Sequence, residues 1–248
     1  AVLMDSVRGA GKTPGAFRLE QNWIGQPGST IEQASFVPPS PLQLQDHLEA
    51  WERYVSGDDV DVLVQCAVVH AQFELLHPFQ DGNGRIGRLL IPLFLFQKRA
   101  LFEPMFYLSE YLEAHRDRYY AQLRAISKAG DWSGWIAFFL DAIVQQAKDN
   151  TRRVQEILHL YEDMKRRIAA LTHSQHAIAV LDALFDRPIF QSGDFVLRSG
   201  IPKGTALAFL QKLKEANILF ALREASGRRP AVLAFRDLLN CAEGRIVF

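Results

Sequence analysis

The spacing of apolar residues predicts a chain that is mostly helical. Apolar positions recur every three or four residues over 60–75, which is the period of a helix with one buried face. A helix is also predicted at 42–55, where the prolines at 38, 39 and 41 end any strand and lead into it. Residues 89–101 are apolar on nearly every side, which predicts a helix at the centre of a core. Further stretches with the helical period cover residues 109–127, 132–146 and 150–171. We therefore expect a bundle of helices.

The residues before this bundle have the pattern of short extended segments. Residues 17–24 and 35–37 read as extended, and the loop 25–30 between them is rich in glycine, proline and serine. This arrangement predicts a small β-hairpin. Residues 1–7 have the pattern of the end of a helix that Gly9 closes, and no initiator methionine precedes them. We interpret the chain as lacking its natural N-terminus.

The pattern changes in the last third of the chain. Helices are predicted at 175–185 and 191–197, and a third helix opens with Pro202 in its first turn. Two alternating segments, 218–223 and 231–235, follow on either side of a basic turn. Three helices followed by a β-hairpin resemble a winged helix-turn-helix. The predicted domains are a helical bundle with a hairpin flap at 1–146, a linker helix at 147–172 and a winged helix-turn-helix at 173–248.

The composition excludes some partners. The 248 residues include 28 Lys and Arg against 28 Asp and Glu, so the formal net charge is zero. No overall charge therefore favours binding to nucleic acid or to a membrane surface. The strongest apolar run, 89–96, is far shorter than the roughly 20 residues of a membrane span. Only two cysteines occur, Cys66 and Cys241, far apart, which is typical of reduced thiols and predicts a cytoplasmic protein.

The chemistry is concentrated at residues 77–88, which read His-Pro-Phe-Gln-Asp-Gly-Asn-Gly-Arg-Ile-Gly-Arg. Pro78 disfavours the α region for His77, so we expect the preceding helix to end at this imidazole. An imidazole with an ordinary pKa near ~6.5 can accept a proton from a hydroxyl nucleophile at neutral pH. Asp81 offers a hard oxygen ligand of the kind that Mg²⁺ prefers.

The second half of this stretch is suited to an anion. The sequence Gly82-Asn83-Gly84 lets backbone N–H groups turn toward an anion, and a helix that begins here adds the positive end of its dipole. Arg85 and Arg88, three residues apart, share one face of the first turn, and guanidinium groups bind phosphate in a bidentate manner. The residues therefore predict a site for a magnesium-bound polyphosphate beside a general base.

The stretch resembles the signature of the Fic family, HPFx(D/E)GNGRxxR, with every defined position present. The resemblance implies a protein adenylyltransferase that transfers AMP from Mg·ATP to a Ser, Thr or Tyr hydroxyl of a target protein or of itself. It implies that His77 is the base, that Asp81 holds Mg²⁺ and that Arg88 holds the γ-phosphate. The nucleotide-binding residues that we expect are Asp81, Gly82, Asn83, Gly84, Arg85, Gly87, Arg88, Ser35 and Tyr119.

The resemblance covers roughly residues 1–146. Segments 14–18 and 21–25 look like those that precede the catalytic helix in Fic proteins, and 115–120 matches a later family segment. It implies that a flap at 25–37 docks the target protein by strand pairing. It also implies that Tyr119 borders the adenine pocket, and it leaves formation of a homodimer open.

One departure from the family pattern concerns regulation. Many relatives carry an inhibitory helix, (S/T)xxxE(G/N), whose glutamate pairs with the second arginine of the signature. The nearest match here, 109–113, is followed by Ala114 and does not fit. We therefore expect Arg88 to be unclamped and the protein to be active unless another protein inhibits it. Hydrolytic removal of AMP is a less favoured alternative because it needs that glutamate, and Gly84 argues against the kinase-like Doc reaction.

A rival from another class is a DNA-binding regulator that senses nucleotide. Residues 172–248 contain ten Lys and Arg against seven Asp and Glu, an excess too slight to favour DNA over protein contacts. His77 is intact, so a degenerate Fic domain is not supported. His70 lies seven residues earlier without a third metal ligand nearby, and we expect it to be a core histidine.

Overall fold

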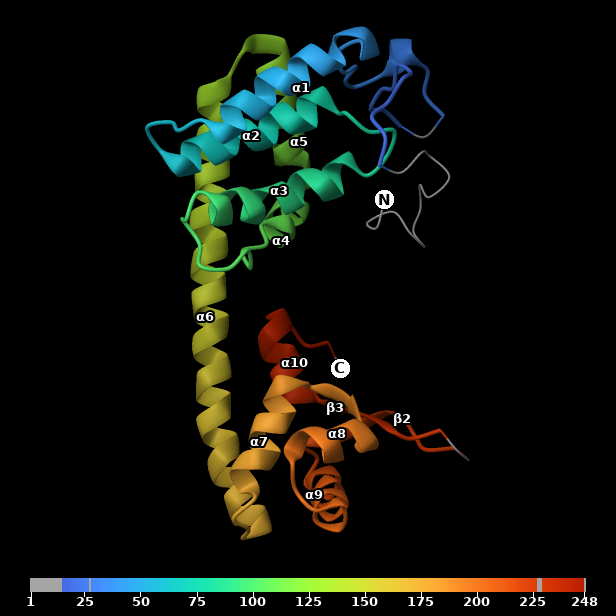
Figure 1. Cartoon of the computed structure of the whole chain (residues 1–248), viewed down its shortest axis with the longest axis vertical. Coiled ribbons are helices and arrows are strands. Elements are labelled where there is room, and N and C mark those ends of the chain that lie inside the picture. The colour runs from blue at the N-terminus through green and yellow to red at the C-terminus, as the bar shows by residue number, and fades with distance from the viewer. Residues whose placement is uncertain (1–14, 27, 227–228, 248) are drawn as a thin grey trace. The chain divides into compact units, whose positions relative to one another are not determined.

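The computed structural model describes residues 15–26, 28–226 and 229–247 (Figure 1). The chain divides into two compact units, Ala1–Ala147, called unit 1, and Lys148–Phe248, called unit 2. The helix end predicted at residues 1–7 lies outside the described residues.

Unit 1 is built of helices. They are α1 (Pro41–Ser56), α2 (Val62–Leu76), α3 (Asn83–Gln97), α4 (Ser109–Ala114), α5 (Arg116–Ala129) and the beginning of α6 (Trp132–Thr172). Polar side chains fix where two of them begin. At the start of α1 the hydroxyl of Ser40 accepts the N–H of Leu42, and at the start of α2 the carboxylate of Asp61 accepts those of Leu63 and Val64. The prediction of a mostly helical fold is confirmed.

Two predicted boundaries were wrong. The segment 109–127 is two helices, because His115 has the non-helical angles φ −113° and ψ 34°. Conversely, the two segments predicted at 132–146 and 150–171 form one helix, α6. No glycine or proline lies between them, and Arg152 pairs with Asp149 one turn away at 2.9 Å, so nothing ends the helix there.

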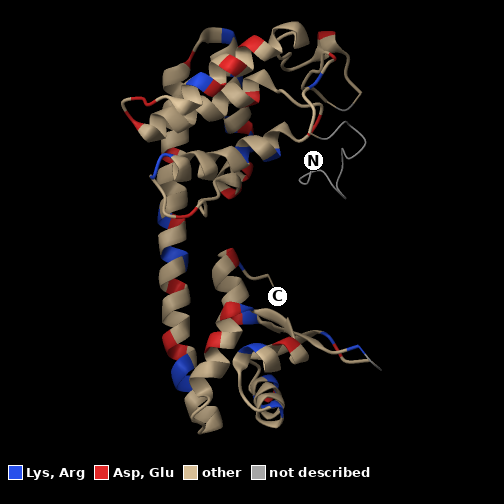
Figure 2. Ribbon diagram, viewed as in Figure 1, with Lys and Arg blue, Asp and Glu red and all other residues tan. Residues whose placement is uncertain are grey.

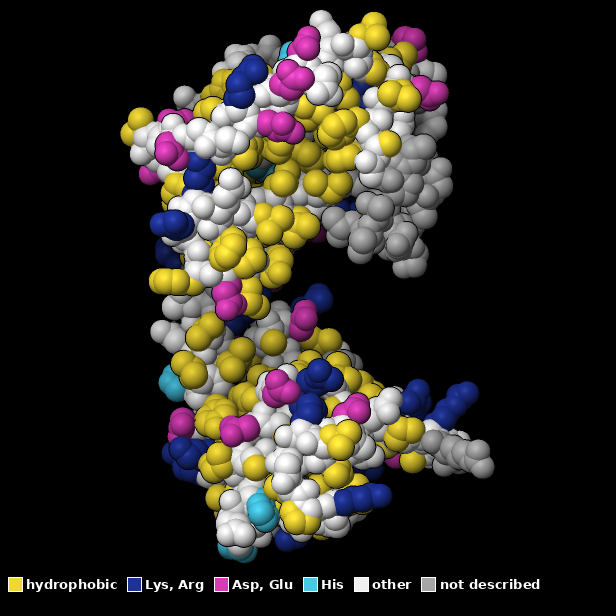
Figure 3. Space-filling model, viewed as in Figure 1, with side chains coloured by type: hydrophobic (Ala, Val, Ile, Leu, Met, Phe, Trp, Pro, Cys, Tyr) yellow, Lys and Arg dark blue, Asp and Glu magenta, His cyan; other side chains and the backbone are white. Residues whose placement is uncertain are grey.

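The core of unit 1 lies between α2, α3, α5 and α6. Three aromatic residues of α6, Trp135, Phe138 and Phe139, are at most 1% exposed, and the indole N–H of Trp135 donates to the carbonyl of Ala67 at 2.9 Å. α3 is not buried all round as predicted, since Leu93 and Phe96 are 43% and 46% exposed. Figure 3 shows apolar side chains gathered on the viewed face of unit 1.

The segment before α1 is irregular rather than a regular hairpin. Its two extended stretches meet in a single antiparallel bridge between Ile24 and Phe36. The short 3₁₀ helix η2 (Ile31–Gln33) occupies the intervening chain, where the Thr30 N–H donates to the Gln33 side chain. Because η2 uses these residues, the strand ladder cannot extend beyond the bridge. We call residues 24–36 the flap.

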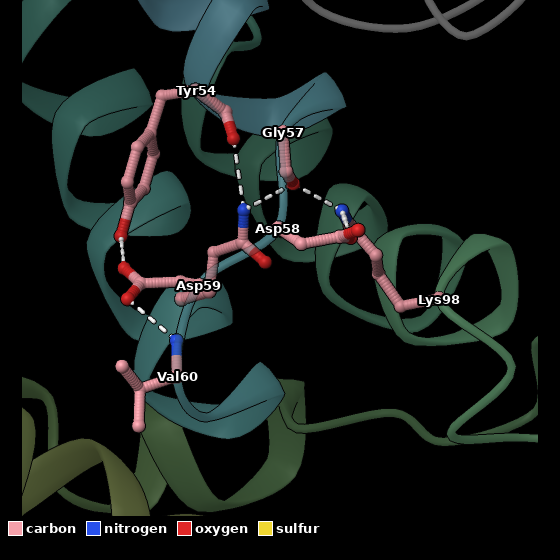
Figure 4. Close-up of polar contacts among 7 residues, drawn as sticks. Tyr54, Gly57, Asp58, Asp59, Val60 and Lys98 are labelled. Atoms are coloured by element: carbon pink, nitrogen blue, oxygen red, sulfur yellow. Dashed lines mark hydrogen bonds and ion pairs between the residues drawn. The ribbon is translucent and has the colours of Figure 1, made fainter.

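The connection between α1 and α2 is fastened to the end of α3 (Figure 4). The ammonium group of Lys98 donates to the carbonyl of Gly57 and to the carboxylate of Asp58, the latter at 2.9 Å. On the other side, the amide of Gln65 donates to the carbonyls of Tyr54 and Gly57, both at 2.8 Å. These contacts help to hold α2 and α3 in register, and residues 77–82 connect those two helices.

Unit 2 follows the order helix, strand, helix, helix, strand, strand, helix after the second part of α6. Its elements are α7 (Ala177–Asp186), β1 (Ile189–Gln191), α8 (Ser192–Ser199), α9 (Lys203–Glu215), β2 (Leu219–Arg223), β3 (Val232–Phe235) and α10 (Arg236–Glu243). The strands form an antiparallel sheet in the order β1-β3-β2. Both strand pairs centre on β3, where Leu233 lies opposite Phe190 and Ala221.

Two elements of unit 2 were not predicted. β1 has only three residues, too few for an alternating pattern to stand out, and it forms because β3 offers a free edge. α10 is only eight residues long and buries a single residue, Leu238, so few positions mark it as a helix. Within the described ranges, no helix is both long enough and apolar enough to cross a membrane.

Candidate active site

The loop between α2 and α3 brings the charged and glycine residues of the stretch 77–88 together. His77 caps the C-terminus of α2 with the left-handed angles φ 48° and ψ 58°, while its N–H still donates to the carbonyl of Phe73 at 3.0 Å. This conformation is uncommon for a residue with a Cβ, and the following Pro78 keeps the chain from continuing as α-helix. The helix therefore ends at the imidazole, as predicted.

Arg18 fastens this turn from the segment before the flap. The residue is 2% exposed, and its guanidinium donates to the carbonyls of His77 at 2.9 Å and Pro39 at 2.5 Å. Its backbone N–H donates to the carbonyl of Pro78 at 2.9 Å. Because carbonyls at the end of a helix lack intrahelical partners, one buried side chain stabilises both the helix end and the strained residue.

Asn83 closes the loop from the other side. Its side-chain oxygen accepts the N–H of Phe79 at 2.9 Å, and its amide donates to the carbonyl of Phe79 at 2.7 Å. The amide of Asn22 donates to the same carbonyl at 3.2 Å. The Asn83 side chain therefore holds the loop in shape. The backbone N–H of Asn83 is a separate group, and it is one of the donors that we predicted for the anion hole.

The start of α3 provides donors for an anion. Gly82 caps the helix with φ 86°, a conformation that favours glycine, and the first N–H groups of α3 have no intrahelical acceptor. A Cβ on Gly84 would lie 3.2 Å from Nη1 of Arg88, so the guanidinium folds back over this first turn. Arg85 lies on the same turn. The positive end of the α3 dipole and the guanidinium group of Arg88 therefore lie at the same place, which suits an anion.

The electrostatics of His77 suit a base. Burial lowers its pKa to about 4, so the imidazole is neutral near pH 7. Its Nδ1 faces the carbonyl of Glu74 at 3.4 Å, which favours the proton on Nδ1 and leaves the lone pair on Nε2.

Asp81 is the candidate metal ligand, and it is half-buried at the tip of the loop. Its Oδ1 accepts the N–H of Gly82 at 2.6 Å. Among the residues that the structure describes, no three His, Cys, Asp or Glu side chains gather into a metal cage. A lone carboxylate fits Mg²⁺ that is held mainly by phosphate oxygens and water, as this ion usually is.

A pocket of about 180 Å³ opens between the flap and α5. Its wall is mostly apolar and aromatic, and it is lined by Ile24, Ser35, Phe36, Glu74, Leu75, Arg116, Tyr120, Leu123 and Arg124. Ser35, one of the predicted residues, lies in this wall, where its hydroxyl donates to the carbonyl of Ile24 at 2.8 Å.

Two of the predicted site residues do not line this pocket. Tyr119 is 3% exposed in the core and contacts Nε2 of His70 through its hydroxyl at 3.0 Å, whereas its neighbour Tyr120 lines the pocket. Gly87 is buried against α2, where an added Cβ would come within 2.3 Å of Oε1 of Glu74. The side chain of Tyr119 and the backbone of Gly87 therefore serve packing. The prediction that His70 is a satisfied core histidine is confirmed, since both ring nitrogens have partners.

Three residues at the site were missed from the sequence. Arg18 lies in the segment 14–18 that resembles the family, but the sequence did not indicate that its side chain reaches the turn at His77. Glu74 gave a signal that was overlooked: it is a carboxylate on the buried face of an apolar helix, three residues before His77. Tyr120 was passed over because the family position favoured its neighbour.

Comparison with known proteins identifies relatives of this site. The Fic/DOC family model matches residues 2–95. A probable protein adenylyltransferase of Aquifex aeolicus is 33% identical over 69 residues, which are 27% of this chain and 22% of that protein. Protein adenylyltransferase Fic of Aedes aegypti is 30% identical over 130 residues, which are 51% of this chain and 23% of that protein. The chain therefore spans less than a quarter of the length of these relatives.

A solved structure shares the fold. A Fic family protein from Desulfovibrio desulfuricans G20 superposes with a TM-score of 0.55 and 18% sequence identity, covering 94% of this chain and 65% of that one. The identity is low, so this likeness concerns the fold alone.

Proposed function

We propose that this chain is a Fic family protein and that unit 1 transfers AMP from ATP to a hydroxyl group of a protein, as its similarity to the Fic/DOC family model and to protein adenylyltransferases supports. The observation that carries the proposal is the placement of a neutral, half-buried imidazole at the end of α2 beside the N-terminus of α3. There the backbone donors of the glycine turn and the guanidinium of Arg88 converge. A base next to an anion site is what phosphoryl-type transfer requires.

In the proposed reaction Nε2 of His77 accepts the proton of the protein hydroxyl. The hydroxyl oxygen forms a bond to the α-phosphorus, the bond from that phosphorus to the bridging oxygen breaks, and pyrophosphate leaves. The N–H groups at Gly82–Gly84 would hold the phosphates next to the reacting centre, and Arg85 and Arg88 the outer ones. The work of this site is thus positioning and charge stabilisation.

Asp81 would hold Mg²⁺ together with the phosphates. The bound ion would neutralise part of the charge on the departing pyrophosphate. The donor set supports this role, since a lone carboxylate beside an anion site suits an ion that retains phosphate and water ligands.

The pocket beside the flap is the proposed place of the adenine base. Its apolar wall with Tyr120 and Phe36 suits a flat aromatic ring, and Ser35 and Arg124 are polar groups at its edge. The flap itself is the proposed docking site of the protein substrate, through the backbone groups that the bridge between Ile24 and Phe36 leaves unpaired.

The test is transfer of label from ATP to protein. The full chain is incubated with Mg·ATP labelled in the α- or the γ-phosphate and with a cell lysate, beside a His77→Ala variant. We expect label on protein hydroxyls from α-labelled ATP only, and none with the variant. Label from γ-labelled ATP would instead indicate a kinase. No transfer despite measurable ATP binding would contradict the proposal and favour the removal of AMP.

For unit 2 we propose a winged-helix module. Its order of elements and its three-stranded antiparallel sheet support this assignment. Figure 2 shows basic residues on α9 and on the β2–β3 hairpin. Two observations favour a protein partner over DNA: Lys214 is engaged with Glu224 at 3.7 Å, and α9 exposes 42% of Leu207.

A further inference from the structure

Glu74 is a buried acid in the wall of the pocket for which the proposed reaction has no use. Its side chain is on α2, one turn before His77, and the residue is 7% exposed. Its Oε1 has no hydrogen-bond partner among the described residues and packs on the backbone of Gly87 of α3. A buried carboxyl oxygen that lacks a partner costs free energy, so its retention beside the proposed nucleotide pocket calls for a role.

Arg88 directly follows Gly87, the α3 residue on which the carboxyl group of Glu74 packs. The charge of this guanidinium acts on the carboxyl group of Glu74, and no hydrogen bond or ion pair to any described residue engages Arg88. Arg88 instead lies over the first turn of α3, next to Gly84, where the phosphates are proposed to bind. Within the described part of unit 1, Glu74 is thus a buried acid on which the charge of the proposed phosphate-binding arginine acts.

The hydrogen bonds of His70 and Tyr119 are compatible with a protonated carboxyl group on Glu74. Nδ1 of His70 lies 3.0 Å from the carbonyl of Gly87, which can only accept, so the ring proton is on Nδ1. Nε2 must then accept the hydroxyl proton of Tyr119, at 3.0 Å. That hydroxyl, which faces Glu74, has no second proton to give. A protonated Glu74 can donate to it, whereas a carboxylate meets only its lone pairs.

The remaining charged groups near Glu74 lie across the pocket on α5. They are Arg116 and Arg124, both exposed to solvent, and Tyr120. On α2 itself the nearest titratable groups are His70 and His77, and burial lowers the pKa of each to about 4, so both are neutral near pH 7. Burial raises the pKa of Glu74 to about 7, although the charge of Arg88 opposes the shift. Glu74 is therefore the group in this set that titrates near neutrality.

We propose that Glu74 is a positioning residue that balances the charge of Arg88 in the nucleotide-free protein and takes up a proton when a nucleotide phosphate engages Arg88. This inference rests on the proposed function. A phosphate anion that engages Arg88 weakens the hold of the guanidinium on the Glu74 carboxylate and adds negative charge nearby, and both effects favour the protonated acid. By linkage, Mg·ATP binding must then weaken as the pH rises through neutrality, because the proton is harder to acquire.

The test is calorimetric titration of the full chain with Mg·ATP in two buffers of different ionisation enthalpy, at pH 5.5, 7.5 and 9. For a shift of about one pKa unit, linkage gives uptake of about half a proton at pH 7.5, and affinity roughly tenfold weaker at pH 9 than at pH 5.5. At pH 5.5 the uptake should vanish, because Glu74 is already protonated. Saturating Mg²⁺ keeps ATP itself from titrating in this range.

The matched variant is Glu74→Gln, which keeps the shape and can donate to Tyr119 but cannot titrate. We expect it to bind Mg·ATP without proton uptake and with an affinity that no longer changes with pH. Glu52→Gln, an exposed change on α1, should behave like the parent chain. Proton uptake that persists in Glu74→Gln, or binding by the parent chain without uptake, would overturn the proposal. If Glu74→Gln fails to fold, the parent titrations still decide it. Absence of any Mg·ATP binding would instead contradict the proposed function.

Discussion

The loop at 77–83 and the flap at 24–36 face the same proposed substrate, yet the chain holds them in different ways. The carbonyls of the loop are bonded by a buried arginine and two asparagines from both sides. The flap is joined across its base by one bridge, between Ile24 and Phe36, and much of it is exposed. The difference suggests that the reacting groups are fixed in advance, whereas the surface that meets a target protein can adapt to it.

Loss of Arg18 should lower activity more than the other changes, because this side chain holds the loop in place. In Arg18→Met the carbonyls of Leu76, His77 and Pro39 lose a charged donor, and such bonds contribute roughly 1.5–3 kcal/mol each. We expect AMP transfer to fall about 100-fold in kcat, equivalent to about 2.7 kcal/mol, because the imidazole is no longer held in its left-handed turn. The measurement is steady-state transfer at saturating Mg·ATP.

Two variants decide whether this effect is one of position. Arg18→Lys keeps the charge and can reach one carbonyl, so part of the rate should return. Arg53→Met, an exposed change on α1, should leave the rate unchanged. An Arg18→Met protein that is folded by circular dichroism and fully active would show that the turn does not depend on this side chain.

Asn83 tests the other side of the loop, with a smaller expected effect. Asn83→Ala removes both bonds to Phe79, at a cost of roughly 1 kcal/mol each, and should lower kcat about 30-fold. In Asn83→Asp the bond from the Phe79 N–H remains while the carboxylate repels the Phe79 carbonyl, so this variant should be no better than alanine. Equal activity of the parent and both variants in the transfer assay would contradict a shaping role for the side chain.

The sequence predicted the helices and the reactive stretch well, for an identifiable reason. The apolar stretch that forms α2 and the order of residues 77–88 are local features, and both could be read without knowing what packs against them, although α2 is buried on more sides than the predicted single face. Arg18 and Glu74 matter through contacts with residues far along the chain or on the next helix, and no local pattern reports such contacts. Tyr119 and Tyr120 show the same limit: both are aromatic, and only packing decides which one reaches the pocket.

Gly87 tests the contact between α2 and α3 that supports the loop. In Gly87→Ala the new Cβ would come within 2.3 Å of Oε1 of Glu74 and 3.2 Å of Phe73, so one side chain must move. Overpacking of this kind costs about 1–3 kcal/mol. We expect a lower urea midpoint and about a tenfold loss of activity.

A double variant separates this clash from a general effect on the helix. Gly87→Ala combined with Glu74→Ala removes the carboxyl group that the methyl meets, so the two losses in unfolding free energy should sum to more than the loss in the double variant. Strictly additive losses would show that Oε1 is not what Gly87 accommodates.

Ser35→Ala should give the smallest effect. It tests the flap in the comparison between the loop and the flap. Ser35→Ala removes one exposed hydrogen bond to Ile24, whose carbonyl still accepts the backbone N–H of residue 35 at 2.8 Å. Because a bond that water can replace contributes about 1 kcal/mol or less, we expect at most a threefold rise in the KM for Mg·ATP with kcat unchanged. Initial rates over a range of Mg·ATP concentrations measure both constants. A fall in kcat as large as that of Asn83→Ala would mean that the flap positions the reacting groups as firmly as the loop does, and the contrast between the two regions would be lost.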